Sequence, residues 1–133
     1  MRNLYDVKIF LDDLREATTV YPHDSDWIVV RDFEKFQDFI AAHGVPDTVS
    51  FDNDLGVDPE GNVLPEGYHA LKWLIENDYY VKHILVHSDN VAASENIAVH
   101  AANWHKFLIS EGLLQADDCS VVRMSALRRK WYM

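Results

Sequence analysis

Short apolar runs recur along the chain, and polar residues follow each run closely. They occupy residues 7–11, 27–31, 48–51, 84–86 and 120–124 and are rich in β-branched side chains. Brief runs of this kind are typical of strands that lie inside a sheet covered on both faces. The pattern therefore predicts five buried strands.

Helical patterns lie between these runs. The first carries Phe36 and Ile40 on one face, with Asp32 placed as its N-cap and Gly44 as its C-terminal stop. A second pattern starts around Tyr68, between the third and fourth runs. Strands that alternate with helices predict an α/β fold with a mainly parallel sheet between two helical layers.

The third helical pattern is the longest and precedes the last run. It carries Ile97, Trp104 and Leu108 on one face, and we expect Ser94 to cap its start and Gly112 to end it. The first connection differs from the others, because only about fifteen residues with several turn formers separate the first two runs. We expect the first crossover helix to be short or missing.

Length and charge narrow the possible functions. The 133 residues fit one domain, residues 1–133, with a single hydrophobic core. The net charge of −10 argues against a membrane-surface binder or a general DNA binder, since such proteins bind through clustered Lys and Arg. The chain has one cysteine and no apolar run near the ~20 residues of a membrane span. We expect a cytoplasmic protein.

Acidic residues follow the predicted strands at the places where ligands bind in open parallel sheets. Asp12 and Asp13 follow the first run, and Asp52 and Asp54 follow the third. Two such charges 4 Å apart repel by about 4 kcal/mol at an effective dielectric constant of ~20. A cluster of this kind needs a proton, a cationic side chain such as Arg15, or a hard divalent cation. The alternative is that these aspartates only cap turns.

A histidine follows the fourth run. His87 is an acid or base, a metal ligand or a buried structural residue, and Ser88 stands beside it. The chain contains no zinc-binding Cys or His pattern, no P-loop, no glycine-rich dinucleotide motif and no nucleophile elbow. The carboxylates and His87 therefore remain the main candidates for chemistry.

These segments resemble the cyclic-phosphate processing receiver family, a derived branch of the response-regulator receivers. The resemblance covers most of the chain and runs through residues 11–15, 50–56, 67–68, 86–88 and 96–97. It implies a flavodoxin-like or receiver-like three-layer sandwich with strand order 2-1-3-4-5. It also implies activity on cyclic phosphates, such as the 2′,3′-cyclic end of an RNA. Proteins of this kind occur in bacteria and their phages, and a phage-encoded one would act in the host cytoplasm.

The resemblance and the residues together give a site hypothesis of a metal-dependent phosphoesterase. Mg²⁺ or Mn²⁺ would be bound by Asp12, Asp13 and Asp52, of which Asp52 corresponds to the residue that accepts a phosphoryl group in receivers. The catalytic set adds Asp54, which would orient water, and His87, which would protonate the leaving alkoxide. The substrate phosphate would be held by Arg15, Ser88 and Asn90.

The chain also departs from ordinary receivers. They carry a lysine after the fifth strand, where this chain has Arg123 and Met124, and it stays open whether Arg123 substitutes for that lysine. Conventional phosphoryl switching is therefore not expected. Two other functions stay open: a non-catalytic receiver-like module that binds a ligand, and an acidic protein, for example from a phage, that binds a host factor.

Overall fold

A parallel sheet forms the centre of the computed structural model, which describes residues 4, 6–24, 26–52, 59–61, 67–88 and 90–124. Within these residues the sheet has five strands in the order β2-β1-β3-β4-β5, and every neighbouring pair is parallel. The strands are β1 (Lys8–Leu11), β2 (Trp27–Val30), β3 (Thr48–Phe51), β4 (His83–Val86) and β5 (Ser120–Arg123). The expected receiver-like α/β fold and its strand order are confirmed.

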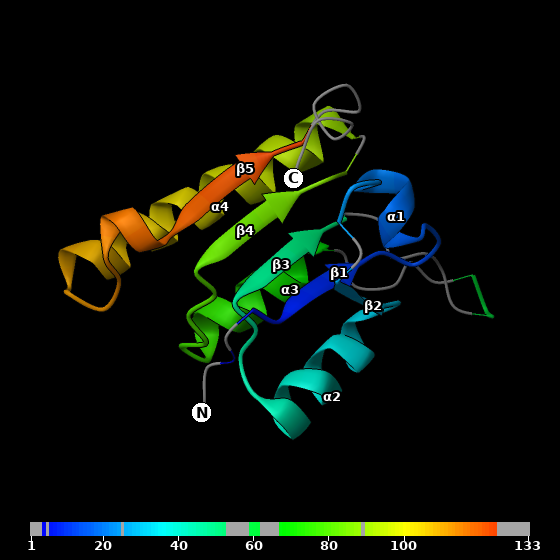
Figure 1. Cartoon of the computed structure of the whole chain (residues 1–133), viewed down its shortest axis with the longest axis horizontal. Helices are drawn as coiled ribbons and strands as arrows, with labels where there is room; N and C mark the ends of the chain where they lie inside the picture. Colours follow the sequence, from blue (N-terminus) through cyan, green and yellow to red (C-terminus); the bar gives the residue numbers. More distant parts are fainter. Residues whose placement is uncertain are drawn as a thin grey trace.

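Helices cover both faces of this sheet (Figure 1). They are α1 (Ala17–Val20), α2 (Phe33–His43), α3 (Gly67–Glu76), α4 (Val91–Ser110) and the 3-10 turn η1 (Ala116–Asp118). The larger core joins α2, α3 and α4 to one face, whereas a smaller cluster joins α1 to the other. The first crossover helix has only four residues, as its short and turn-rich connection predicts.

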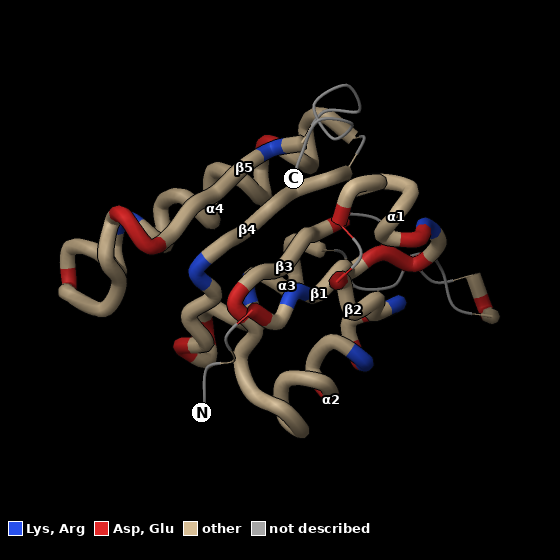
Figure 2. The backbone as a smooth tube through the Cα atoms, in the orientation of Figure 1, with Lys and Arg blue, Asp and Glu red and all other residues tan. Residues whose placement is uncertain are grey.

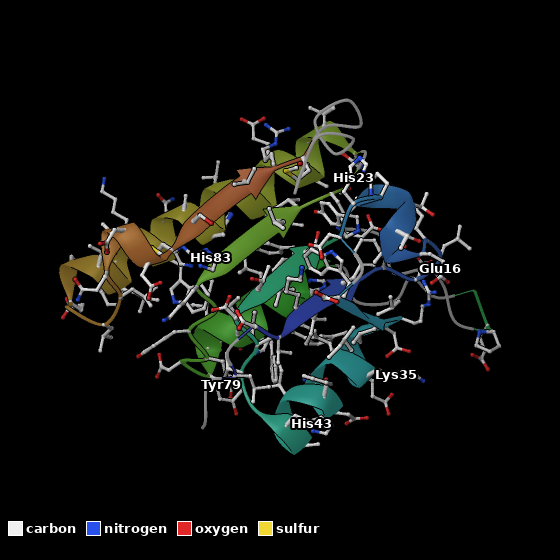
Figure 3. All side chains as sticks on the ribbon, in the orientation of Figure 1. Glu16, His23, Lys35, His43, Tyr79 and His83 are labelled. Atoms are coloured by element: carbon white, nitrogen blue, oxygen red, sulfur yellow. The ribbon has the colours of Figure 1, made fainter. Side chains whose placement is uncertain are left out.

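The two faces of the sheet differ in polarity. In β1, Ile9 and Leu11 enter the larger core, whereas Phe10 points to the α1 side. Alternation along β3 likewise places Val49 in the larger core and Ser50, the register partner of Phe10, on the α1 side. Side chains fill the space between sheet and helices (Figure 3). A completely buried serine on the α1 side needs hydrogen-bond partners.

The longest helix, α4, starts earlier than expected. Its N-cap is Asn90 and not Ser94, which is buried inside the helix and accepts a hydrogen bond from Arg123 Nε. Both residue types cap helices well, so the sequence did not separate them. Gly112, at φ 74°, follows the helix end as expected. None of the helices in the described ranges has the length and apolar character of a membrane span.

The start of α2 offers a test of local helix capping. The Asp32 side chain accepts a hydrogen bond from the Lys35 backbone amide, as the sequence pattern predicts. Replacing Asp32 by alanine should therefore lower the free energy of unfolding by about 1 kcal/mol. Urea denaturation measures this loss, with Asp38→Ala on the exposed side of the same helix as control. An equal loss in both variants would contradict the capping role.

Candidate functional site

The parallel register brings three ionisable side chains to one edge of the sheet. Leu11, Phe51 and Val86 lie side by side in β1, β3 and β4, so the residues after them emerge at the same level. Ligand atoms of Asp12, Asp52 and His87 all lie within 4.8 Å of one another. Figure 2 shows acidic positions directly after β1 and β3. The expected convergence is therefore present for these three residues.

The Asp12 carboxylate is completely buried and held at both oxygens. Its Oδ1 accepts hydrogen bonds from the backbone amides of Leu14 and Arg15, both at 2.9 Å. Its Oδ2 accepts from Arg15 Nε at 2.9 Å and from His87 Nε2 at 3.0 Å. A carboxylate offers about four acceptor positions, and donors from the described residues fill them.

These contacts determine the ionisation of Asp12. Burial by itself raises the pKa of the Asp12 carboxyl group. The hydrogen bond from His87, the two backbone amides and the charge of Arg15 act in the opposite direction and outweigh burial. The pKa of Asp12 is therefore well below its usual range, and the side chain is a carboxylate at neutral pH.

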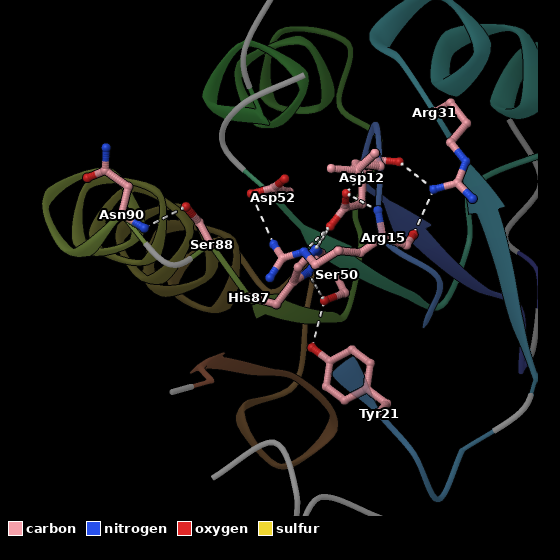
Figure 4. A network of polar contacts seen from close by, with 10 residues as sticks. Asp12, Arg15, Tyr21, Arg31, Ser50, Asp52, His87, Ser88 and Asn90 are labelled. Atoms are coloured by element: carbon pink, nitrogen blue, oxygen red, sulfur yellow. Dashed lines mark hydrogen bonds and ion pairs between the residues drawn. The ribbon is translucent and has the colours of Figure 1, made fainter. Parts of the chain in front are cut away.

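Arg15 supplies positive charge between two carboxylates. Besides its bond to Asp12, its Nη2 lies 3.5 Å from Asp52 Oδ1, and one quarter of its side chain is exposed (Figure 4). Arg31 stabilises the loop after β1, since its Nη1 donates to the backbone oxygens of Arg15 at 2.7 Å and Asp12 at 3.2 Å. Arg31 also pairs with Glu16. The cationic side chain that the clustered carboxylates require is therefore Arg15.

His87 lies behind Asp12, with no exposed surface. Its Nδ1 is 2.6 Å from Ser50 Oγ, which is 2.7 Å from the Tyr21 hydroxyl. Its ring stacks on Phe10 with centroids 4.3 Å apart and planes 10° apart. Because the Asp12 carboxylate only accepts, Nε2 of His87 carries the shared hydrogen.

A pocket of about 250 Å³ opens at this edge of the sheet. It is lined by Asp12, Asp13, Leu14, Arg15, Asp52, Ser88 and Asn90. The structure therefore brings together all three expected metal ligands and all three expected substrate-binding residues. His87 is not among the described residues that line the pocket, and Asp54 lies outside the described residues.

The start of α4 forms one wall of the pocket. Asn90 Oδ1 accepts a hydrogen bond from the Ala93 amide at 3.0 Å and caps the helix. The Asn90 backbone amide donates to Ser88 Oγ at 3.3 Å. A helix start presents partial positive charge and favours anions. Ser88 and Asn90 thus lie where the partial positive charge at the start of α4 would stabilise a bound phosphate group.

Two other polar residues lie away from the pocket. Arg123 donates to Ser94 Oγ and to the Val91 backbone oxygen, and it lines a separate groove between α4 and β5. Arg123 is not among the described residues that line the pocket at the ends of β1 and β3. His83 lies at the start of β4, at the opposite end from Glu16 and the pocket loop (Figure 3).

Sequence reasoning missed Tyr21, Ser50 and Arg31 as parts of the site. Ser50 carried a usable signal, because a polar residue inside a buried strand must find a partner on its own face. His87 shares that face two positions beyond the partner of Ser50 in β4. Tyr21 and Arg31 carried no comparable signal, since their contacts depend on the path of the loop between β1 and β2.

A family model described as the cyclic-phosphate processing receiver domain matches residues 7–103. The chain belongs to this family. No curated protein and no solved structure matches the chain significantly. The matched range of the receiver domain runs from β1 into α4 and includes every pocket residue described above, whereas β5 lies outside it.

The donor set of this receiver domain fits a hard divalent cation. Asp12, Asp13 and Asp52 offer carboxylate oxygens around one pocket, which is the ligand type that Mg²⁺ and Mn²⁺ prefer. The Arg15 guanidinium already takes the role of a cation between Asp12 and Asp52. A metal ion at Asp12 would therefore compete with Arg15 for the same oxygen.

The lowered pKa of Asp12 predicts how stability depends on pH. Because its folded-state pKa lies below the ordinary value of 3.8, the carboxylate stabilises the fold above about pH 4 and loses this effect as the pH falls further. Asp12→Asn should therefore be clearly less stable than the wild type at pH 7, and the gap should narrow below pH 4. Urea denaturation at several pH values measures the gap, with the exposed Asp38→Asn on α2 as control. A gap independent of pH would contradict this role.

Proposed function

We propose that the pocket is the centre of a metal-dependent phosphoesterase that acts on cyclic phosphates, such as 2′,3′-cyclic phosphate ends of RNA or cyclic nucleotides. One observation carries the proposal: three carboxylates and a guanidinium line one pocket at the carboxyl edge of the sheet. The family to which the chain belongs is described by cyclic-phosphate processing, which supports this substrate class. The volume of about 250 Å³ suits the phosphate and part of its sugar better than a whole nucleotide.

The metal site in this proposal consists of Asp12, Asp13 and Asp52. A bound Mg²⁺ or Mn²⁺ would act as a Lewis acid on the phosphate and as a template for its orientation. Asp13 is exposed on the pocket wall, whereas Asp12 and Asp52 are buried. The buried pair therefore supplies fixed charge, and Asp13 approaches from the solvent side.

Arg15 has a double role in this proposal. Its contact with Asp52 is long, at 3.5 Å, and its partly exposed guanidinium presents several donors. When a cation neutralises the carboxylates, Arg15 is released to hold two phosphate oxygens in a bidentate pair. Ser88 and Asn90 then hold the phosphate on the side of α4.

The reaction adds one water molecule to the ring phosphate. The water oxygen forms a bond to phosphorus, one ring P–O bond breaks, and the released sugar oxygen takes up a proton to give a phosphate monoester. Asp54 remains the proposed group for orienting the water. The proposed proton from His87 would have to pass Asp12, because His87 Nε2 faces that carboxylate and not the pocket.

Hydrolysis of a 2′,3′-cyclic nucleotide tests this proposal directly. Ring opening should depend on Mg²⁺ or Mn²⁺, and Asp13→Asn should slow it at least about tenfold, a barrier change of about 1.4 kcal/mol. The exposed position of Asp13 makes a folding defect a poor explanation for such a loss. Product formation is followed by phosphorus NMR, with Asp38→Asn on α2 as the matched control. Equal turnover in all three proteins would remove the proposal, and ligand binding without product would favour a non-catalytic module.

The competition between Arg15 and a cation gives a second prediction. Arg15→Ala should bind Mn²⁺ several-fold more tightly, because Asp12 and Asp52 lose their internal cation. The same variant should bind inorganic phosphate more weakly, because it lacks the guanidinium. Calorimetry measures both affinities, with Arg123→Ala in the separate groove as the control. Weaker Mn²⁺ binding by Arg15→Ala would contradict the competition.

A further inference from the structure

A continuous chain of hydrogen bonds leads from the pocket at the edge of the sheet to the face that α1 covers. It passes from Asp12 through His87 and Ser50 to Tyr21, with distances of 3.0, 2.6 and 2.7 Å (Figure 4). Each of these four residues is completely buried. They come from four places in the chain: the ends of β1 and β4, the middle of β3 and the end of α1. Such a buried polar chain is costly unless its members satisfy one another.

The direction of the bond between His87 Nε2 and Asp12 does not depend on how the other protons are arranged. With a neutral ring, Tyr21 donates to Ser50, and Ser50 donates to Nδ1 of His87. With a charged ring, Nδ1 donates to Ser50, and Ser50 donates to Tyr21. In both arrangements Nε2 of His87 carries a hydrogen and donates it to Asp12. The serine and the tyrosine can therefore pair with Nδ1 in either ring state while Nε2 keeps its hydrogen bond to Asp12.

We propose that Ser50 and Tyr21 are positioning residues for Asp12 and act through His87. The importance of Asp12 for cation and phosphate binding rests on the proposed function, whereas the positioning itself does not. Phe10 stacks on the ring and limits its tilt, and the hydrogen bond at Nδ1 fixes the direction in which Nε2 points. Removing a residue that hydrogen-bonds to a metal ligand commonly lowers metal affinity or activity 10–100-fold.

Removing the Ser50 hydroxyl would break the chain at its middle. In Ser50→Ala, Nδ1 of His87 loses its hydrogen bond to Ser50 Oγ, and the ring is no longer held with Nε2 aimed at Asp12. When the ring tilts, or when its hydrogen moves to Nδ1, Asp12 Oδ2 loses the hydrogen bond from Nε2. The carboxylate would be expected to shift and to loosen the turn in which Oδ1 accepts from the Leu14 and Arg15 amides.

Hydrogen exchange at these two amides reports on Asp12 without any metal or substrate. In Ser50→Ala, the Leu14 and Arg15 amides should exchange roughly tenfold faster, which corresponds to one lost hydrogen bond. Tyr21→Phe, which lacks only the hydroxyl, should change them in the same direction by a smaller factor. Ser50→Thr, which keeps a hydroxyl, should restore slow exchange. The matched control is Thr48→Ala, because Thr48 is a buried hydroxyl residue of the same strand that bonds to Asp47.

Nitrogen NMR of the His87 ring and Mn²⁺ titration complete the test. The wild type should show hydrogen on Nε2, and Ser50→Ala should show a mixture of tautomers and bind Mn²⁺ about tenfold more weakly. Faster exchange at Leu14 and Arg15 together with the altered ring signal supports the proposal, even if the wild type hydrolyses no cyclic phosphate or binds no Mn²⁺. Unchanged exchange overturns it, as does faster exchange with an unchanged ring signal. Equal acceleration in Thr48→Ala also overturns it, because the effect would then be general loosening of β3.

Discussion

Two buried carboxylates at the ends of adjacent parallel strands impose the main constraint on this structure. Asp12 and Asp52 emerge at the same level because β1 and β3 pair in register, and no change of rotamer takes them far apart. Their repulsion must be balanced inside the protein. The chain achieves this with Arg15, three residues after Asp12, and with the hydrogen bond from His87 on β4. The conformation of the loop after β1 follows from this requirement.

The same requirement explains why the two faces of the sheet differ. One face packs against α2, α3 and α4 and needs only apolar side chains. The other face lies under a four-residue helix, and it carries Ser50 and His87 among Phe10, Tyr21 and Trp27. Burial of these polar groups is tolerated because each bonds to the next and the last bonds to a charged group. The shorter helix thus covers the part of the sheet that supports the pocket.

The fold could be predicted from the sequence because local residue patterns mark its strands and helix ends. The strands were predicted within one or two residues at each end, and Asp32 was identified as a cap from its place before an apolar helical face. The start of α4 was wrong by four residues, since Asn90 and Ser94 are both suitable caps and only burial and the Arg123 contact separate them. Local patterns do not contain such contacts across elements.

The candidate site could be predicted from the sequence only in part, because contacts between distant elements leave no local pattern. The identities of Asp12, Asp13, Asp52 and Arg15 followed from their places after strands, because parallel strands bring their ends together. The rotamer that places Arg15 between two carboxylates, and the loop that brings Tyr21 to Ser50, are tertiary features. His87 illustrates the difference most clearly. Its position in the sequence suggested contact with a substrate, whereas its burial behind Asp12 favours an action through that carboxylate.

The arrangement also bears on how such a pocket can bind ligands of opposite charge. Arg15 lies between Asp12 and Asp52 and supplies positive charge to both carboxylates. In the proposed function, a cation that binds the carboxylates would free the guanidinium, and a phosphate that binds the guanidinium would free the carboxylates. Each ligand would therefore lower the free-energy cost of binding the other, which is positive coupling in the thermodynamic sense.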